Sequence, residues 1–198
     1  MGRPILMILS ILLILCLYWE ATEAQVLTPV PIITEIENIN KSTATIEDSV
    51  LIENRVMHSF SQMDKQDQFY ICIKGKSIID GKMMFKIIKS DGTVILNEEF
   101  PSCYLLNYGF EGDIHSVKDR EDFIKSRISD FFNENNFLHP AIQPNESFDE
   151  DYSDKLIWDE IKSDQTSIGF SYLIGEEDIR MISFSKKKGK VVMYFNCC

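Results

Sequence analysis

An apolar run at the amino terminus decides which part of this chain is available to fold as a domain. Arg3 precedes an almost unbroken apolar stretch, Ile5 to Trp19, and small residues follow at Thr22 and Ala24. This order of charge, apolar stretch and small residues is that of a secretory signal peptide. As a helix, the stretch extends about 22 Å, less than the roughly 30 Å hydrocarbon core of a bilayer. We therefore expect export, with residues 1–24 as a signal peptide cleaved after Ala24.

Two alternatives to this cleavage remain open. Leu13-Ile14-Leu15-Cys16 carries the leucine and the cysteine of a bacterial lipobox, which makes Cys16 a lipidation candidate, with the lipoprotein signal ending just before it. Leu15 departs from that pattern, because a small Gly or Ala normally precedes the lipidated cysteine. The other alternative is an uncleaved anchor or a buried helix.

The charge and composition of the chain indicate which classes of binding partner are disfavoured. Its 198 residues allow one domain with appendages, and 44% hydrophobic with 26% charged residues is typical of a globular protein. The formal net charge of -11 disfavours binding to nucleic acid and to anionic lipid head groups. We expect no nucleic-acid partner, and membrane contact only through the N-terminal segment if it is lipidated or uncleaved.

Residues 25–45 are expected to form a linker, because Pro29 and Pro31 interrupt a stretch without sustained periodicity. A single globular domain is expected over 46–198. Strand patterns there occupy seven segments: Ser49–Ser59, Gln68–Lys74, Lys82–Lys89, Thr93–Phe100, Ser167–Ile174, Ile179–Ser185 and Lys190–Cys198. Ser90-Asp91-Gly92 predicts a tight hairpin turn between the third and fourth of them.

Two helices are predicted between the strand groups. The first runs from Val117 to about Asn133, with Ser116 as N-cap and Asp119 completing a capping box. The second runs from about Asp154 to Lys162, with Ser153 as its cap. The order of elements predicts an α+β fold: a single domain with a mainly antiparallel β-sheet and two helices packed on one face.

Four cysteines remain after removal of the leader: Cys72, Cys103, Cys197 and Cys198. In an oxidising compartment they allow three full pairings, which sequence cannot distinguish. Neighbours on a strand point to opposite faces, so Cys197 and Cys198 are expected to reach different partners. We expect at least one of them to bridge to Cys72 or Cys103. Free buried thiols and a metal or redox role are the alternatives.

No residue pattern predicts a catalytic, cofactor or metal site. Asp149, Asp151, Ser153 and Glu160 fall at ligand positions of a calcium loop, but Asp154 replaces the glycine that the loop needs for its bend. We interpret this segment as an acidic loop that caps the second helix. Ser171 lacks the second glycine of a nucleophile elbow and is expected to be an ordinary strand residue.

Two stretches carry a resemblance to known proteins. They are Asp80 to Pro101, with the hairpin at its centre, and Gly169 to Cys198, which ends in Tyr-Phe-Asn-Cys-Cys. Together they resemble small exported proteins of Gram-negative bacteria that are described as lipoproteins or as uncharacterised proteins. The resemblance implies a location in the bacterial envelope and implies no catalytic or binding residue.

We expect an exported protein of the periplasm, outer envelope or extracellular space, and most simply a non-enzymatic module that binds a macromolecular or cell-surface partner. One alternative is a small hydrolase whose acid or base comes from loop residues such as Asp113, His115 or His139. Another is an inhibitor or immunity protein that covers a basic site with its acidic surface.

The cysteine pairing gives a first testable prediction. If the chain matures in an oxidising compartment, the denatured but unreduced protein will offer fewer thiols to an alkylating agent than the reduced protein. Intact-mass measurement with and without reductant counts them. Modification of all four cysteines before reduction would contradict the bridge.

Overall fold

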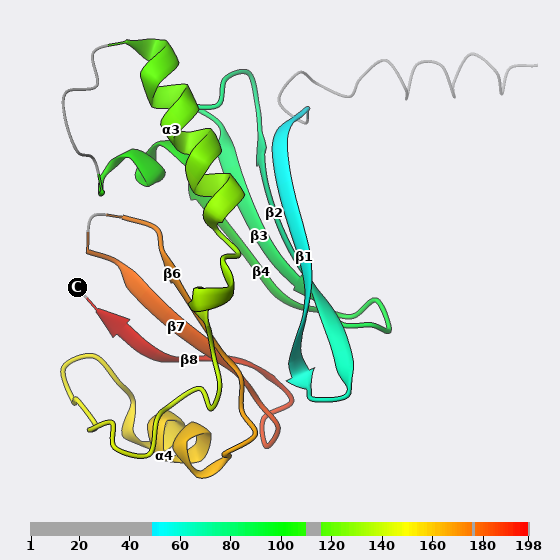
Figure 1. Ribbon diagram of the computed structural model, residues 1–198, viewed down its shortest axis with the longest axis vertical. Helices are drawn as coiled ribbons and strands as arrows, with labels where there is room; N and C mark the ends of the chain where they lie inside the picture. The colour runs from blue at the N-terminus through cyan, green and yellow to red at the C-terminus, as the bar shows by residue number, and fades with distance from the viewer. Residues whose placement is uncertain (1–48, 110–115, 176, 198) are drawn as a thin grey trace, which may run out of the picture. The chain divides into compact units, whose positions relative to one another are not determined.

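The computed structural model of the protein describes residues 49–109, 116–175 and 177–197, which belong to one compact unit (Figure 1). The expected signal peptide and linker, with Cys16, lie outside the described residues, as do Asp113, His115 and Cys198.

The first sheet is a meander of four antiparallel strands in chain order. These are β1 (Val50–Gln62), β2 (Lys65–Lys74), β3 (Lys82–Ile88) and β4 (Val94–Pro101). The turn before β4 is the predicted one, and Gly92 adopts the positive φ of 86° that such a hairpin turn requires. All four predicted strands are thus present.

The second sheet is also antiparallel and ordered along the chain. Its strands are β5 (Phe137–Leu138), β6 (Gly169–Leu173), β7 (Ile179–Ser185) and β8 (Lys190–Cys197). The last three confirm the predicted strands. The two-residue β5 was not predicted, because so short a segment carries no periodic pattern.

The α+β class and the antiparallel pairing are therefore confirmed, but the strands form two sheets rather than one. Within each sheet every strand pairs with its neighbour along the chain, while the connection between the sheets runs through a helix. Alternation of apolar residues identifies strands, yet it does not determine which strands share hydrogen bonds.

Helix α3 (Val117–Asp130) begins as predicted, with Ser116 and Asp119 forming both bonds of the capping box. It ends three residues earlier than expected. Helix α4 (Lys155–Ser163) is capped by Asp154, whose carboxylate accepts the backbone N–H groups of Leu156 and Ile157. The cap is thus Asp154 and not the predicted Ser153. Two 3-10 helices, η2 (Ser102–Leu106) and η3 (Glu134–Asn136), complete the described elements.

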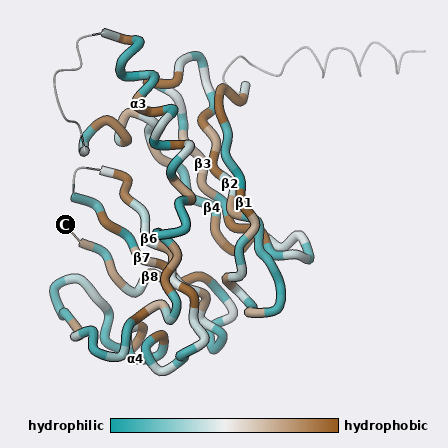
Figure 2. The backbone as a smooth tube through the Cα atoms, viewed as in Figure 1, coloured by the Kyte–Doolittle hydropathy of each residue, from teal (hydrophilic) through white to brown (hydrophobic). Residues whose placement is uncertain are grey.

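An aromatic core joins the two sheets. The rings of Phe85 on β3 and Phe170 on β6 lie 5.7 Å apart, and Phe69 on β2 lies 5.2 Å from Phe170. Phe131 and Phe132, directly after α3, insert their rings into the same cluster. Figure 2 shows in brown the hydrophobic residues along the strands of both sheets.

The two helices cover different layers, which corrects the prediction that both pack on one face. Ile124 and Ile128 of α3 are buried in the core between the sheets. Trp158 and Ile161 of α4 instead pack on Tyr194, on the opposite side of the second sheet. Strands β6 to β8 carry apolar residues on both faces, so the core between the sheets covers one face of the second sheet and α4 covers the other.

The outer face of the first sheet carries charged and hydroxyl groups beside apolar ones. Glu53 and Arg55 on β1 lie beside Tyr70 on β2, whose hydroxyl donates to the Glu53 carboxylate at 2.8 Å. In the part of the chain that the structure describes, no helix has the length and apolar content to span a membrane.

A polar link also connects the sheets. The Tyr172 hydroxyl on β6 donates to Glu98 on β4 at 2.8 Å, and the Arg180 guanidinium lies 3.5 Å from the same carboxylate. Tyr172 is only 3% exposed, and this burial, together with the Glu98 charge, raises its pKa. The hydroxyl therefore stays protonated as the donor.

Tyr172→Phe removes this donor without changing the ring. Because the bond goes to a carboxylate, we expect a loss of about 1.5–3 kcal/mol in the free energy of unfolding, measured by urea denaturation. Tyr104→Phe, at an exposed tyrosine on η2, is the matched control and should leave the stability within about 0.5 kcal/mol. Equal stability of the two variants would contradict the role of the link.

Alkaline pH should destabilise the protein. Burial raises the pKa of Tyr172 and of Tyr194 above the ordinary value of 10.0. Because the folded-state pKa is the higher one, their contribution is complete below about pH 10 and is lost as the pH rises above it. We expect the melting temperature to fall there, and to fall less in Tyr194→Phe. A flat profile through this range would contradict the prediction.

Candidate binding site

A cavity of about 330 Å³ lies where the end of α3, the η3 turn and β6 meet. Its lining includes one cation, Arg127, and one anion, Asp130, both from the last turn of α3. The asparagines of the Asn133-Glu134-Asn135-Asn136 segment and Ser171 on β6 supply further polar groups. The cavity therefore combines charge with amide and hydroxyl groups.

The cavity exists because β5 accompanies β6 for only two residues. Phe137 pairs with Phe170 and Leu138 pairs with Gly169, whereas the preceding residues turn away as η3. Asn133 stabilises that turn, since its side chain accepts the backbone N–H of Asn135 at 3.0 Å. The segment Ser171–Leu173 of β6 is thus not continued by a β5 partner.

Arg127 is held firmly at this cavity. Its guanidinium carbon lies 4.1 Å from the ring centroid of Tyr108 and 4.8 Å from that of Phe123, and Nη2 donates to the Tyr108 carbonyl at 2.8 Å. Among the described residues no carboxylate forms an ion pair with Arg127, and its buried Nε has no hydrogen-bond partner. The guanidinium therefore retains unused hydrogen-bonding capacity.

Two neighbours fix the position of this arginine. The Tyr108 hydroxyl donates to the Leu173 carbonyl at 3.0 Å, which attaches the ring to β6. Gly109 has a φ of 70°, and a side chain there would meet Arg127, because an added Cβ would lie 1.9 Å from Nη2. Glycine is thus required for the guanidinium to lie against Tyr108.

The charges of the cavity suit a peptide end better than a simple anion. Arg127 can bind a carboxylate with charge-assisted hydrogen bonds. Asp130 lines the same cavity, so a small anion meets repulsion there. A peptide end presents amide N–H donors next to its carboxylate, and can satisfy both charged groups.

Sequence reasoning did not single out this site. It treated Ser171 as an ordinary strand residue, and the structure places Ser171 within β6 and on the lining of the cavity. Neither described histidine, His58 or His139, lines it. The available signal was an arginine in the last helical turn followed by three asparagines, which is not a motif on its own.

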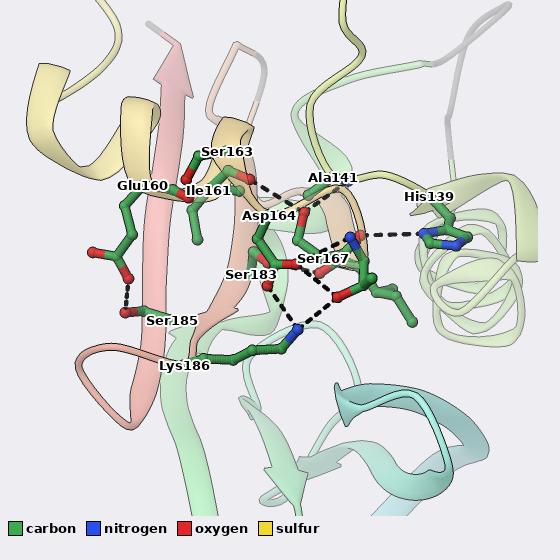
Figure 3. Close-up of polar contacts among 12 residues, drawn as sticks. His139, Ala141, Glu160, Ile161, Ser163, Asp164, Ser167, Ser183, Ser185 and Lys186 are labelled. Carbon is green, nitrogen blue, oxygen red and sulfur yellow. Dashed lines mark hydrogen bonds and ion pairs between the residues drawn. The ribbon is translucent and has the colours of Figure 1, made fainter.

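His139 lies in a different polar network, drawn in Figure 3. Its Nδ1 is 3.3 Å from the Ser167 carbonyl, and that carbonyl also accepts the Ala141 N–H at 3.0 Å. Nearby, Lys186 in the β7–β8 turn pairs with Asp164 at 2.7 Å. These contacts fasten the loops around α4 to the second sheet, and no carboxylate contacts His139 among the residues drawn.

The other described histidine, His58, lies away from the lining of the cavity. The ring of His58 stacks on Phe137 at 3.8 Å, and its Nε2 lies 3.4 Å from the exposed Glu134 carboxylate. Asp113 and His115 lie outside the described residues.

The acidic segment before α4 is used for structure. Asp154 caps the helix, Glu160 accepts a hydrogen bond from the Ser185 hydroxyl, and Asp149 accepts the backbone N–H of Asp151 at 3.0 Å. Within the described ranges, no group of three His, Cys, Asp or Glu side chains is arranged to hold a metal ion.

The cysteines are not part of the cavity. Cys72 on β2 is fully buried and Cys103 on η2 is half-buried, and both are free thiols in this structure. Cys197 ends β8, and Cys198 lies outside the described residues. Because Cys72 and Cys103 are both free, the structure contains no bridge from Cys197 to either of them, and the expected bridge stays a prediction.

Comparison with known proteins adds no further assignment. No protein family matches the chain, and no curated protein or solved structure matches it.

Proposed function

We propose that the protein is a non-enzymatic binding module that holds the carboxyl end of an extended peptide in the cavity beside Arg127. The observation that carries this proposal is the state of Arg127: a guanidinium clamped between two aromatic rings, with no described ion-pair partner, on the lining of a cavity.

The size and walls of the cavity support a short peptide segment. A volume of about 330 Å³ falls at the lower end of the range of small-ligand sites, roughly 300–1,000 Å³. Beside it, Ser171–Leu173 of β6 lacks a β5 partner, and extended peptides commonly bind by adding main-chain hydrogen bonds to such an edge.

The carboxylate at the end of a peptide supplies the negatively charged hydrogen-bond acceptor that Arg127 lacks among the described residues. A guanidinium offers several N–H donors in a planar fork that matches a carboxylate. Tyr108 and Phe123 already restrict the arginine side chain, so binding costs little additional conformational entropy. Asparagine side chains on the η3 turn can both donate to and accept from the peptide amides.

The proposal also states in which cellular compartment the protein acts. The N-terminal segment favours action outside the cytosol, in the envelope or the extracellular space, where the partner is a protein with an accessible carboxyl end. Cell fractionation tests this part independently of the cavity, since a cytosolic protein that retains its initiator methionine would refute export and leave peptide binding untouched.

A matched pair of peptides tests the cavity. Acetyl-trialanine with a free carboxylate should bind the full-length protein at least about tenfold more tightly than the same peptide with a C-terminal amide, because the amide removes the charge-assisted bonds. Isothermal titration calorimetry measures both. Equal affinities, or no binding of the free acid at millimolar concentration, would refute the proposal.

Substitution on the protein side completes the test. Arg127→Gln should abolish the preference for the free acid, and Arg127→Lys should weaken it while retaining the charge. Arg120→Gln removes an exposed arginine from the first turn of the same helix and should change nothing. Thermal melting of each variant separates lost binding from lost folding.

A further inference from the structure

Strand β1 lies at one edge of the first sheet. Among the described residues it pairs with β2 alone, and over Val50 to His58 it contains no proline and no lysine. At the opposite edge, β4 carries Glu98 and Glu99 and ends at Pro101, features that oppose strand addition. Figure 1 shows the two strands at the two edges of this sheet. The difference makes β1 the edge open to a partner strand.

Four exposed side chains of β1 form a short pattern in which reversing the direction of the strand exchanges its acid and its base. Glu53 and Arg55 occupy its centre, with their side chains 42% and 55% exposed. Leu51 and Met57 flank them, 38% and 52% exposed. Two apolar residues thus enclose an acid and a base at intervals of two residues.

We infer that β1 pairs antiparallel with β1 of a second copy of this chain, about a two-fold axis at Asn54. In that register Glu53 lies opposite the partner's Arg55, and Arg55 lies opposite the partner's Glu53. Leu51 likewise lies opposite the partner's Met57. Directly opposed residues of antiparallel strands are the pairs whose side chains interact, so each charge meets its opposite and each exposed apolar side chain meets another.

The inner face of β1 supports the same register. Ile52 and Val56 pack against the core between the sheets, yet both stay only partly buried because they lie at its edge. Pairing about Asn54 places Ile52 opposite the partner's Val56, and the reverse. Their remaining apolar surface is then covered by the second copy, and the two sheets become one of eight strands.

The charges exclude the neighbouring symmetric registers. A two-fold axis at Arg55 would place two arginines opposite each other, and an axis at Glu53 would place two glutamates together. Only the axis at Asn54 gives opposite charges at both positions. Within one copy, Arg55 already contacts Glu53 at 2.5 Å and lies over the Tyr70 ring, so the pair is ordered for association. In the dimer the two pairs form a network of four charges.

Sedimentation equilibrium of the full chain, purified as its host processes it, tests the inference. We expect a monomer–dimer equilibrium in the wild type. Arg55→Glu places Glu53 opposite a glutamate of the partner at two symmetric positions, and should weaken the dimer at least about tenfold. Glu53→Arg should do the same with positive charges.

Two rescue experiments distinguish the register from a general effect of charge. The double variant Glu53→Arg/Arg55→Glu exchanges the two charges and should restore the dimer. A mixture of the single variants Arg55→Glu and Glu53→Arg should form a heterodimer, because one chain then carries two acids and the other two bases. Lys187→Glu, in the exposed β7–β8 turn, makes the same change in net charge and should leave the equilibrium unchanged.

Each other outcome overturns the inference. A wild type that is monomeric at high micromolar concentration refutes pairing. A dimer that resists both single substitutions refutes the register, and indicates association through another surface such as the apolar N-terminal segment. Loss of the dimer in the single variants without rescue by exchange refutes the opposed charge pairs. Circular dichroism of each variant checks that β1 remains folded.

Discussion

Aromatic packing between the two sheets is the contact on which the rest of this structure depends. Phe85 and Phe69 project from the first sheet and Phe170 projects from the second, with ring centroids 5–6.5 Å apart. Each sheet has one face that would otherwise be exposed apolar surface, and together they bury it. Edge-to-face and tilted ring contacts of this kind add specificity to the burial of area.

The same packing creates the cavity. Phe131 and Phe132 must enter the core immediately after α3, so the helix ends at Asp130 and the chain turns at Asn133. That turn delays β5, so Ser171–Leu173 of β6 pair with β7 but have no partner on the β5 side. The polar groups at Arg127 and the η3 asparagines then collect around the gap. The core residues Phe131 and Phe132 are thus neighbours in the sequence of the polar residues that line the cavity, and the end of α3 positions both groups.

The division into two sheets also determines which surfaces remain open. The second sheet is covered on one face by the aromatic core and on the other by α4 and its loops. Within the described ranges, the first sheet is covered on one face only, and its edge strand β1 pairs with β2 alone. The two surfaces proposed for interaction therefore lie on the first sheet and at the junction of α3 with β6, where packing leaves polar groups and strand edges accessible.

Short-range patterns of residues were enough to locate most of the secondary structure. Alternation located seven strands, Gly92 located a hairpin, and Ser116 with Asp119 located the start of α3, because each of these signals acts over a few residues. The N-cap of α4 was harder to predict, because Ser153 and Asp154 are neighbours and both residue types favour that position. The division of the strands into two sheets, the placement of the helices on different layers and the packing of Arg127 on Tyr108 follow from contacts in the folded chain. Those contacts join residues far apart in the chain, and their energy depends on burial and geometry that no local pattern contains.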